Sequence, residues 1–327
     1  MKKIWQLWMT AALAALLLVG CGQEEVKPKE NQDNTQQEVT VDEQAGSEIT
    51  FPITMTDAIG EDIILEEAPK TIVSMQPSNT EILFALGLND EIIGVNDNDN
   101  YPEEALDKEK IGGMEFNVEK IVALNPDIVF AHESGLGVGE AGLQQIRDSG
   151  VKVYVVKNAV DFNETYTTIE EIGRATGKFE EAQTIVEDMK AKVEEVKEKV
   201  ANVEMKKTVF VETSDVPDIY TAGKGTFMQE IFDMVNAENI AADQEGWFKM
   251  ESEEIVNRNP DVIIVMYSYV EGIVESVKAR DGFDSITAVK NNEVVQVDEN
   301  LTSRTGPRLA EGLEEVAKAI YPEAFSE

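Results

Sequence analysis

Glu119-x-Ile121-Val122-x-x-Asn125-Pro126-Asp127 is the stretch that organises this chain, because it returns as Glu253-x-Ile255-Val256-x-x-Asn259-Pro260-Asp261. Each copy runs directly into an apolar segment, residues 128–131 in the first case and 262–266 in the second. The second copy begins 134 residues after the first, which is too long a period for a solenoid repeat. We therefore expect two lobes of similar design with a ligand-binding cleft between them, because ligand sites are common at domain interfaces.

Segments with the patterns of strands and of helices alternate on both sides of each copy. Each copy itself predicts a helix that ends before the Asn-Pro pair, because the residue before proline avoids the helical region, and then a buried strand. Such alternation predicts an α/β fold with mainly parallel sheets and helices on both faces. A hairpin is expected at residues 53–65, strands at 71–75, 91–95, 127–131, 151–156, 208–211, 262–266 and 294–297, and helices at 78–86, 118–124, 142–149, 226–235, 252–258 and 308–320.

A long helix is expected between the two halves, because residues 179–203 contain neither proline nor glycine. Its apolar stripe, with spacings of three and four residues, consists of Val186, Met189, Val193, Val196 and Val200. A single helix of this length makes a stiff link. The predicted organisation is an N-terminal lobe at residues 48–178, a connecting helix at 179–203 and a C-terminal lobe at 204–327.

The first residues resemble targeting and tethering segments rather than parts of a fold. Residues 1–20 have a basic start and a short apolar core, which is the layout of a secretory signal peptide. They end in front of Cys21, the single cysteine of the chain, which we expect to carry a lipid. Residues 21–47 are polar and acidic and are expected to form a disordered tether. The alternative is a free cysteine that ends a short membrane anchor.

The charge balance restricts the possible partners. The chain has 64 acidic against 28 basic residues and a formal net charge of −36. A surface of this kind repels nucleic acid, whose binding depends on basic patches, and it also repels anionic membrane surfaces. We therefore expect no nucleic-acid partner, and we expect membrane attachment by the lipid alone.

No constellation for catalysis or direct metal binding is visible in the sequence. His132 is the single histidine, whereas a zinc or manganese receptor would use several. Residues 97–100 begin like a calcium loop, but Pro102 stands where that loop needs glycine. Residues 223–226 lack the full pattern of a phosphate loop. We expect a protein that is not an enzyme and has no cofactor. A surface-anchored two-lobed α/β hydrolase and a metal-ion receptor remain the alternatives.

Candidate ligand contacts lie in loops that follow predicted strands, where open α/β sheets bind ligands. Aromatic side chains offer large contact areas there, and basic side chains can hold a carboxylate or phosphate. The alternatives are core packing for His132 and the tyrosines, and a surface ion pair for the arginines. The candidates are Tyr101, His132, Tyr220, Lys224, Trp247, Phe248, Tyr267, Tyr269, Arg304 and Arg308.

Two motifs resemble a known family. Ile72-Val73-Ser74-Met75-Gln76-Pro77-Ser78-Asn79-Thr80-Glu81-Ile82-Leu83-Phe84-Ala85-Leu86-Gly87 and Arg304-x-Gly306-Pro307-Arg308-Leu309-Ala310-Glu311-Gly312-Leu313 are similar to segments of the substrate-binding proteins for iron-siderophores, haem and vitamin B12. The repeated Asn-Pro-Asp strands fit the same family. The resemblance implies two Rossmann-like lobes joined by one long rigid helix, which is the class III arrangement, with little domain closure.

The resemblance also implies a function and partners. The chain would be the lipid-anchored receptor of an ABC importer at the outer face of the cell membrane. It would act as a monomer that passes a metal chelate, a corrinoid or a ferric siderophore, to permease subunits. The family uses one exposed glutamate of each lobe to dock onto permease arginines, and Glu81 and Glu230 match these positions. Glu81 also fits a capping box with Ser78 as the N-cap residue.

Overall fold

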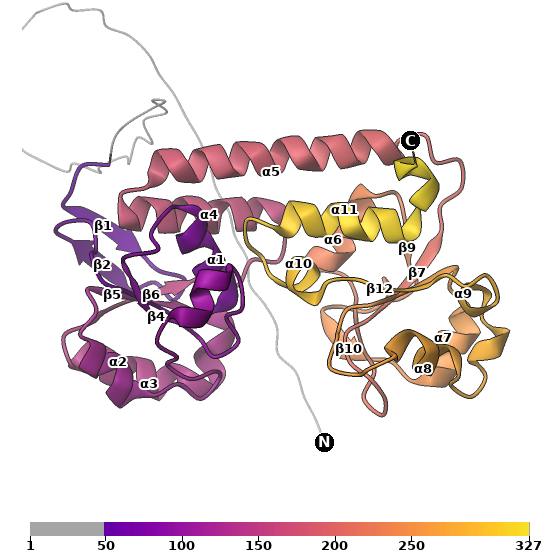
Figure 1. Cartoon of the computed structure of the whole chain (residues 1–327), viewed down its shortest axis with the longest axis horizontal. Coiled ribbons are helices and arrows are strands. Elements are labelled where there is room, and N and C mark those ends of the chain that lie inside the picture. Colours follow the sequence, from indigo (N-terminus) through magenta and orange to yellow (C-terminus); the bar gives the residue numbers. More distant parts are fainter. Residues whose placement is uncertain (1–48, 327) are drawn as a thin grey trace, which may run out of the picture. The chain divides into compact units, whose positions relative to one another are not determined.

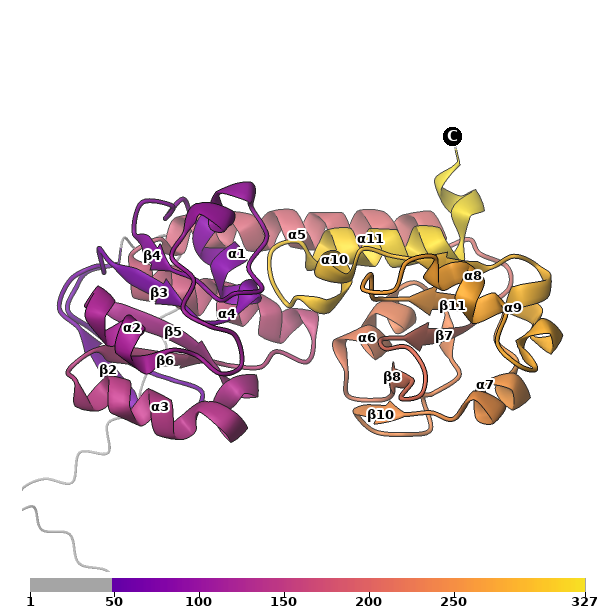
Figure 2. The same ribbon diagram turned by 60° about the horizontal axis from the view of Figure 1, so that its bottom comes forward.

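The computed structural model describes residues 49–326, which carry two four-stranded parallel sheets (Figures 1 and 2). The strand orders are β4-β3-β5-β6 in the N-terminal lobe and β12-β11-β7-β9 in the C-terminal lobe. The described residues form one compact unit. The predicted signal peptide, Cys21 and the tether lie outside the described residues.

The N-terminal lobe follows the predicted order of elements. Residues 53–65 form the expected antiparallel hairpin, in which Ile53 pairs with Leu65. The strands are β1 (Ile53–Thr56), β2 (Asp62–Leu65), β3 (Ile72–Ser74), β4 (Ile92–Gly94), β5 (Ile128–His132) and β6 (Lys152–Val156). The helices are α1 (Pro77–Ala85), α2 (Val118–Leu124), α3 (Leu136–Asp148) and α4 (Phe162–Thr176).

The C-terminal lobe adds a small antiparallel pair, β8 with β10, to its parallel sheet. Its strands are β7 (Thr208–Glu212), β8 (Tyr220–Ala222), β9 (Glu238–Asn239), β10 (Trp247–Lys249), β11 (Val262–Val265) and β12 (Val294–Gln296). Its helices are α6 (Phe227–Met234), α7 (Ser252–Arg258), α8 (Ile273–Lys278), α9 (Thr287–Lys290), α10 (Glu299–Ser303) and α11 (Leu309–Ile320). Short 3-10 turns occupy η1 (Glu103–Asp107), η2 (Glu133–Gly135), η3 (Phe283–Ser285) and η4 (Pro322–Phe325).

The repeated phrase forms the same step in both lobes. Helices α2 and α7 end at Asn125 and Asn259, whose φ angles of 49° and 45° lie in the left-handed region that asparagine tolerates. The aspartate two residues later then accepts a backbone hydrogen bond from the start of the neighbouring strand. Asp261 Oδ2 accepts the backbone N–H of Thr208 at 2.9 Å, as Asp127 Oδ2 accepts that of Thr71 at 3.0 Å. The repeat therefore sets the register between adjacent parallel strands.

The connecting helix is confirmed as α5 (Phe179–Val200), and all five predicted stripe residues are buried in it. It packs along α4 and α11 (Figure 1). One buried apolar cluster includes Ile82 of α1, Ile169 of α4, Val186 of α5 and Leu313 of α11, so the core continues from one lobe into the other.

Two expectations about the helices were wrong. Helix α4 was not predicted, because its buried face carries threonines that look polar in sequence. In the helix, Thr168 and Thr176 donate their hydroxyl hydrogens to the carbonyls of Thr165 and Ile172. The capping box at α1 is also wrong, because Pro77 already occupies the first turn and the N-cap residue is Gln76, without a side-chain cap.

Candidate functional site

A hollow of about 570 Å³ lies where loops of the two lobes meet. Its N-terminal wall is the loop that follows β4, and its C-terminal wall comes from the ends of β7 and β11 and from α10. Carboxyl ends of parallel strands are the usual ligand edge of α/β sheets. The lining includes Asp97, Asn98, Asp99, Asn100, Thr213, Met266, Tyr267, Tyr269, Asn300 and Arg304.

Asp99 holds the N-terminal wall together. Its side chain is 2% exposed, and Oδ2 accepts hydrogen bonds from Thr80 Oγ1 and the backbone N–H of Asn96, both at 2.8 Å. Burial raises the pKa of Asp99 to about 6, although these hydrogen bonds and the nearby Lys110 act in the opposite direction. Lys110 Nζ also donates to the Asp99 carbonyl at 2.8 Å, so the loop is braced from two sides.

Two tyrosines form part of the C-terminal wall. The rings of Tyr267 and Tyr269 stack with centroids 4.8 Å apart. Tyr267 is buried and donates its hydroxyl hydrogen to Glu212, whereas Tyr269 is exposed and its hydroxyl oxygen accepts the N–H of Asp215 at 2.9 Å. Both predicted tyrosines therefore line the hollow, but only Tyr269 offers a large free face.

A second hollow, of about 340 Å³, lies within the N-terminal lobe and contains His132 in its wall. This side chain is 7% exposed, and its Nδ1 lies 2.7 Å from Ser134 Oγ. Burial lowers the pKa of His132 to about 4, against the opposing effect of Glu133, so the imidazole is neutral at physiological pH. The exposed side chains of Met114 and Val138 make much of this wall apolar.

The antiparallel strand pair β8–β10 carries the other predicted aromatics. Tyr220 and Trp247 are each 44% exposed, and Tyr220 pairs with Lys249 across the two strands. Phe248 packs against the core of the C-terminal lobe. Lys249 is held by Asp218 and Glu251, and Lys224 is exposed. Tyr220 and Trp247 are therefore the aromatic side chains of this strand pair that are exposed enough to contact a ligand.

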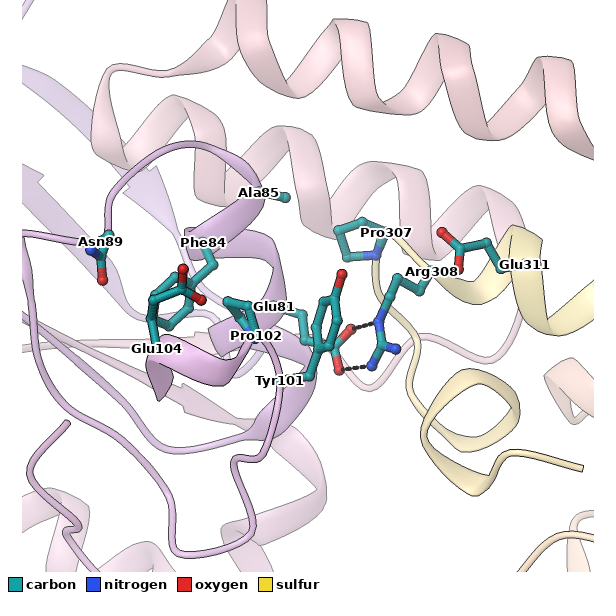
Figure 3. A pocket seen from close by; sticks show the side chains of 10 residues that line it. All are labelled: Glu81, Phe84, Ala85, Asn89, Tyr101, Pro102, Glu104, Pro307, Arg308 and Glu311. Atoms are coloured by element: carbon teal, nitrogen blue, oxygen red, sulfur yellow. Dashed lines mark hydrogen bonds and ion pairs between the residues drawn. The ribbon is translucent and has the colours of Figure 1, made fainter. Parts of the chain in front are cut away.

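Arg304 and Arg308 hold a carboxylate of the chain itself, that of Glu81. Figure 3 shows Glu81 with Arg308. Arg308 donates to both oxygens of Glu81, at 2.8 and 2.7 Å, and Arg304 donates to Oε1 at 2.7 Å. The guanidinium of Arg308 also lies 3.5 Å from the ring centre of Tyr101. Tyr101 and Arg308 line a separate hollow of about 450 Å³ beside α1, and Tyr101 is not among the residues that line the 570 Å³ hollow.

The expectation that Glu81 and Glu230 are exposed was wrong. Glu81 is 3% exposed. Glu230 is half-buried, and its Oε2 accepts the backbone N–H of Phe162 at 2.7 Å. Glu119 and Glu253, which were not among the predicted site residues, are exposed in the first turns of α2 and α7. The repeat itself was the signal that could have found them, because it places them at equivalent points of the two lobes.

The described residues show two further features that concern function. Between residues 49 and 326, no group of three or more histidine, cysteine, aspartate or glutamate side chains is arranged to hold a metal ion. No helix in that range is both long enough and apolar enough to cross a bilayer.

Comparison with known proteins agrees with this geometry. The model of the periplasmic binding protein family matches residues 72–301. The chain belongs to this family. It is 42% identical over 330 residues, with full coverage of both chains, to a protein of Bacillus subtilis named as the uncharacterized ABC transporter substrate-binding lipoprotein YvrC.

Other relatives of the family have named ligands. The chain is 29% identical over 254 residues to the vitamin B12-binding protein of Vibrio campbellii. The matched region covers 76% of this chain and 88% of that protein. A solved structure from Staphylococcus epidermidis, described as a possible iron-binding solute-binding protein, is 38% identical. It has a TM-score of 0.71 and covers 78% of this chain and 100% of its own. The family therefore confirms the predicted two-lobed fold with one connecting helix.

Proposed function

We propose that this chain is the substrate-binding lipoprotein of an ABC importer, with residues 48–178 and 204–327 as its two lobes. It would be anchored at the outer face of the cell membrane by a lipid on Cys21. It would bind a corrinoid between its lobes and deliver it to the permease, while other subunits hydrolyse ATP. The family membership and the name of the Bacillus subtilis relative support this proposal.

The observation that favours a corrinoid over a ferric siderophore is the pairing of Arg304 and Arg308 with Glu81. An anionic catecholate chelate needs free cations in its site. Lys249 is also paired, and Lys224 is exposed but does not line the 570 Å³ hollow. The formal net charge of the chain is −36. A corrinoid has a large flat ring with an amide rim, and it can use aromatic faces and the amide side chains of Asn98 and Asn300.

Docking to the permease also needs a new assignment. A bidentate contact with a permease arginine requires an accessible carboxylate. Glu81 is buried, and Glu230 already accepts a backbone hydrogen bond. Glu119 and Glu253 are exposed, and no hydrogen bond or ion pair within residues 49–326 engages either side chain. We therefore propose this pair, one glutamate on each lobe, as the docking carboxylates.

Fluorescence can test the ligand proposal, because Trp247 is the single tryptophan outside the predicted signal peptide. Cyanocobalamin, ferric haem and a ferric catecholate siderophore are titrated into the mature chain. We expect saturable quenching by cyanocobalamin and none by the catecholate. Equilibrium dialysis provides a control for ligand absorbance. Binding of the catecholate alone would reject the corrinoid, and binding of none of the three would reject the proposed substrate class.

A further inference from the structure

Glu81 and Glu230 each contact the opposite lobe. Glu81 lies on α1, the first helix of the N-terminal lobe, and its arginine partners immediately precede α11, the last helix of the C-terminal lobe. Glu230 lies on α6, the first helix of the C-terminal lobe, and its partner Phe162 begins α4, the last helix of the N-terminal lobe before α5. Each lobe therefore sends a glutamate from its first helix to the start of the other lobe's last helix.

The contact at Glu81 is a buried three-membered ion cluster. The side chains of Arg304 and Arg308 are 11% and 15% exposed, and both direct guanidinium N–H groups at the same carboxylate. Figure 3 shows the contact with Arg308. Arg304 also donates to the Asn98 carbonyl at 3.3 Å. Gly306, between the two arginines, lies close to the backbone of Ser78 at the start of α1. The loop before α11 is thus fastened to the N-terminal lobe at several points.

The contact at Glu230 completes the N-terminus of α4. The first N–H groups of a helix have no partner within the helix, and this end of the helix dipole favours negative charge. Asp161 Oδ1 accepts the N–H of Glu164 at 2.7 Å, and Glu230 Oε2 accepts that of Phe162. One cap therefore comes from the N-terminal lobe itself and the other from the C-terminal lobe.

We propose that Glu81 and Glu230 form a reciprocal clasp that fixes the width of the ligand cleft. They are positioning residues, and this role rests on the proposed ligand-binding function of the cleft. A long helix such as α5 is a stiff link but can still curve gently, so contacts away from its axis restrict the small changes in lobe separation that it permits. The two glutamate contacts add two further points of attachment. The same loop that Glu81 holds also supplies Arg304 to the wall of the 570 Å³ hollow.

The clasp predicts a loss of preorganisation when either contact is removed. Glu81→Gln keeps the size of the side chain and removes the charge that the two arginines contact. Glu230→Met keeps a similar size and removes the oxygen that accepts the Phe162 N–H, which a glutamine oxygen would still accept. If the binding-competent fraction falls to about a tenth, the apparent affinity for cyanocobalamin falls about tenfold. Glu187→Gln is the matched control, because Glu187 is exposed on α5 and no hydrogen bond or ion pair within residues 49–326 involves its side chain.

The distance between the lobes gives a readout that does not depend on the ligand. Spin labels are attached to Glu140→Cys in the N-terminal lobe and Asp284→Cys in the C-terminal lobe, in the full chain with Cys21→Ser. Both positions are exposed. We expect a narrow distance distribution in the parent and in Glu187→Gln, and a broader one in each clasp variant. The double variant should be broadest, and bound ligand should narrow it again.

An unchanged distance distribution in the double variant would overturn the clasp. If Glu81→Gln does not fold, Arg304→Gln serves in its place, because it removes one of the three arginine hydrogen bonds to Glu81. A broader distance distribution would again support the clasp, and an unchanged one would overturn it. Failure of the parent protein to bind cyanocobalamin would reject the proposed ligand but would leave the distance measurement, and therefore the clasp, separately testable.

Discussion

Arg280 forms a two-bond ion pair with Glu212 beneath the cleft, with both N–O distances at 2.7 Å. The Glu212 side chain is completely buried, and it also accepts the hydroxyl hydrogen of Tyr267. This pair therefore supports the tyrosine stack from below. Because a buried charge without its partner is costly, the stability of the C-terminal lobe depends on both members being present.

We expect Arg280→Met to lower the free energy of unfolding by about 3–5 kcal/mol, because it leaves the Glu212 carboxylate buried without its cation. Urea titration, monitored by circular dichroism, measures the change in the free energy of unfolding. The double variant with Glu212→Gln removes the buried charge and keeps an oxygen that accepts the Tyr267 hydroxyl, so it should recover part of the loss. Asp215 loses its 2.7 Å contact with Arg280 in both variants. Equal stability of the single variant and the parent would show that the ion pair is not coupled to folding.

Asp99 should give the chain a distinctive pH dependence. Its pKa is about 6 in the folded state against 3.8 ordinarily, so its contribution favours folding below pH 3.8 and is lost as the pH rises through about 6. Relative to the parent, Asp99→Asn should gain up to about 3 kcal/mol of stability between pH 4 and pH 7. Urea titrations at both pH values test this. A stability difference that does not change with pH would contradict the assignment.

The exposed aromatics of the antiparallel strand pair β8–β10 are expected to contribute to ligand affinity, although neither lines the 570 Å³ hollow. Trp247→Ala and Tyr220→Ala are each expected to weaken cyanocobalamin binding about tenfold or more, because each removes an exposed aromatic face. Equilibrium dialysis is the appropriate measurement, since fluorescence depends on Trp247. Met205→Ala alters a more exposed apolar side chain in the loop after α5 and should bind normally. Normal binding by both Trp247→Ala and Tyr220→Ala would show that the strand pair β8–β10 does not contact the ligand.

Charge reversal at Glu119 and Glu253 should uncouple binding from transport. The double variant Glu119→Arg and Glu253→Arg is expected to bind cyanocobalamin like the parent but to support little uptake in cells, because each new cation repels a permease arginine. Glu187→Arg and Glu323→Arg make the same charge change at exposed positions elsewhere. Undiminished uptake in the docking variant would exclude this pair, and weakened ligand binding would place the two residues in the cleft instead.

Two helical glycines, Gly312 and Gly137, should differ in how substitution by alanine changes the stability of the chain. A Cβ atom at Gly312 would lie 2.2 Å from the Leu301 carbonyl oxygen, where α11 crosses α10. Gly312→Ala should therefore cost about 2 kcal/mol or more. A Cβ atom at Gly137 in α3 would meet nothing within 4 Å, so Gly137→Ala should be neutral or stabilising by up to about 1 kcal/mol. Thermal denaturation of both variants compares them directly, and equal effects would refute the close approach.

Local periodicity and turn chemistry predicted most of the fold. Helices 118–124 and 252–258 have the predicted bounds, because Asn-Pro ends a helix by local sterics that no distant contact changes. The stripe of α5 was equally clear, since a helix that packs on one side must repeat apolar residues every three or four positions. Helix α4 was not predicted, because its buried face includes threonines, which are polar in sequence. Their hydroxyl groups can be buried because they donate to carbonyls of the same helix.

The sequence alone determined that the chain has two lobes of one design, a stiff link between them and no visible catalytic set. Only the tertiary structure decided what the charged residues of the motifs do. Glu81, Arg304 and Arg308 are each compatible with docking, ligand binding or a surface ion pair when considered separately. More than two hundred positions separate Glu81 from either arginine, and folding joins them in one buried cluster. The partner of a charge depends on which segments fold against each other, and residue spacing does not carry that information.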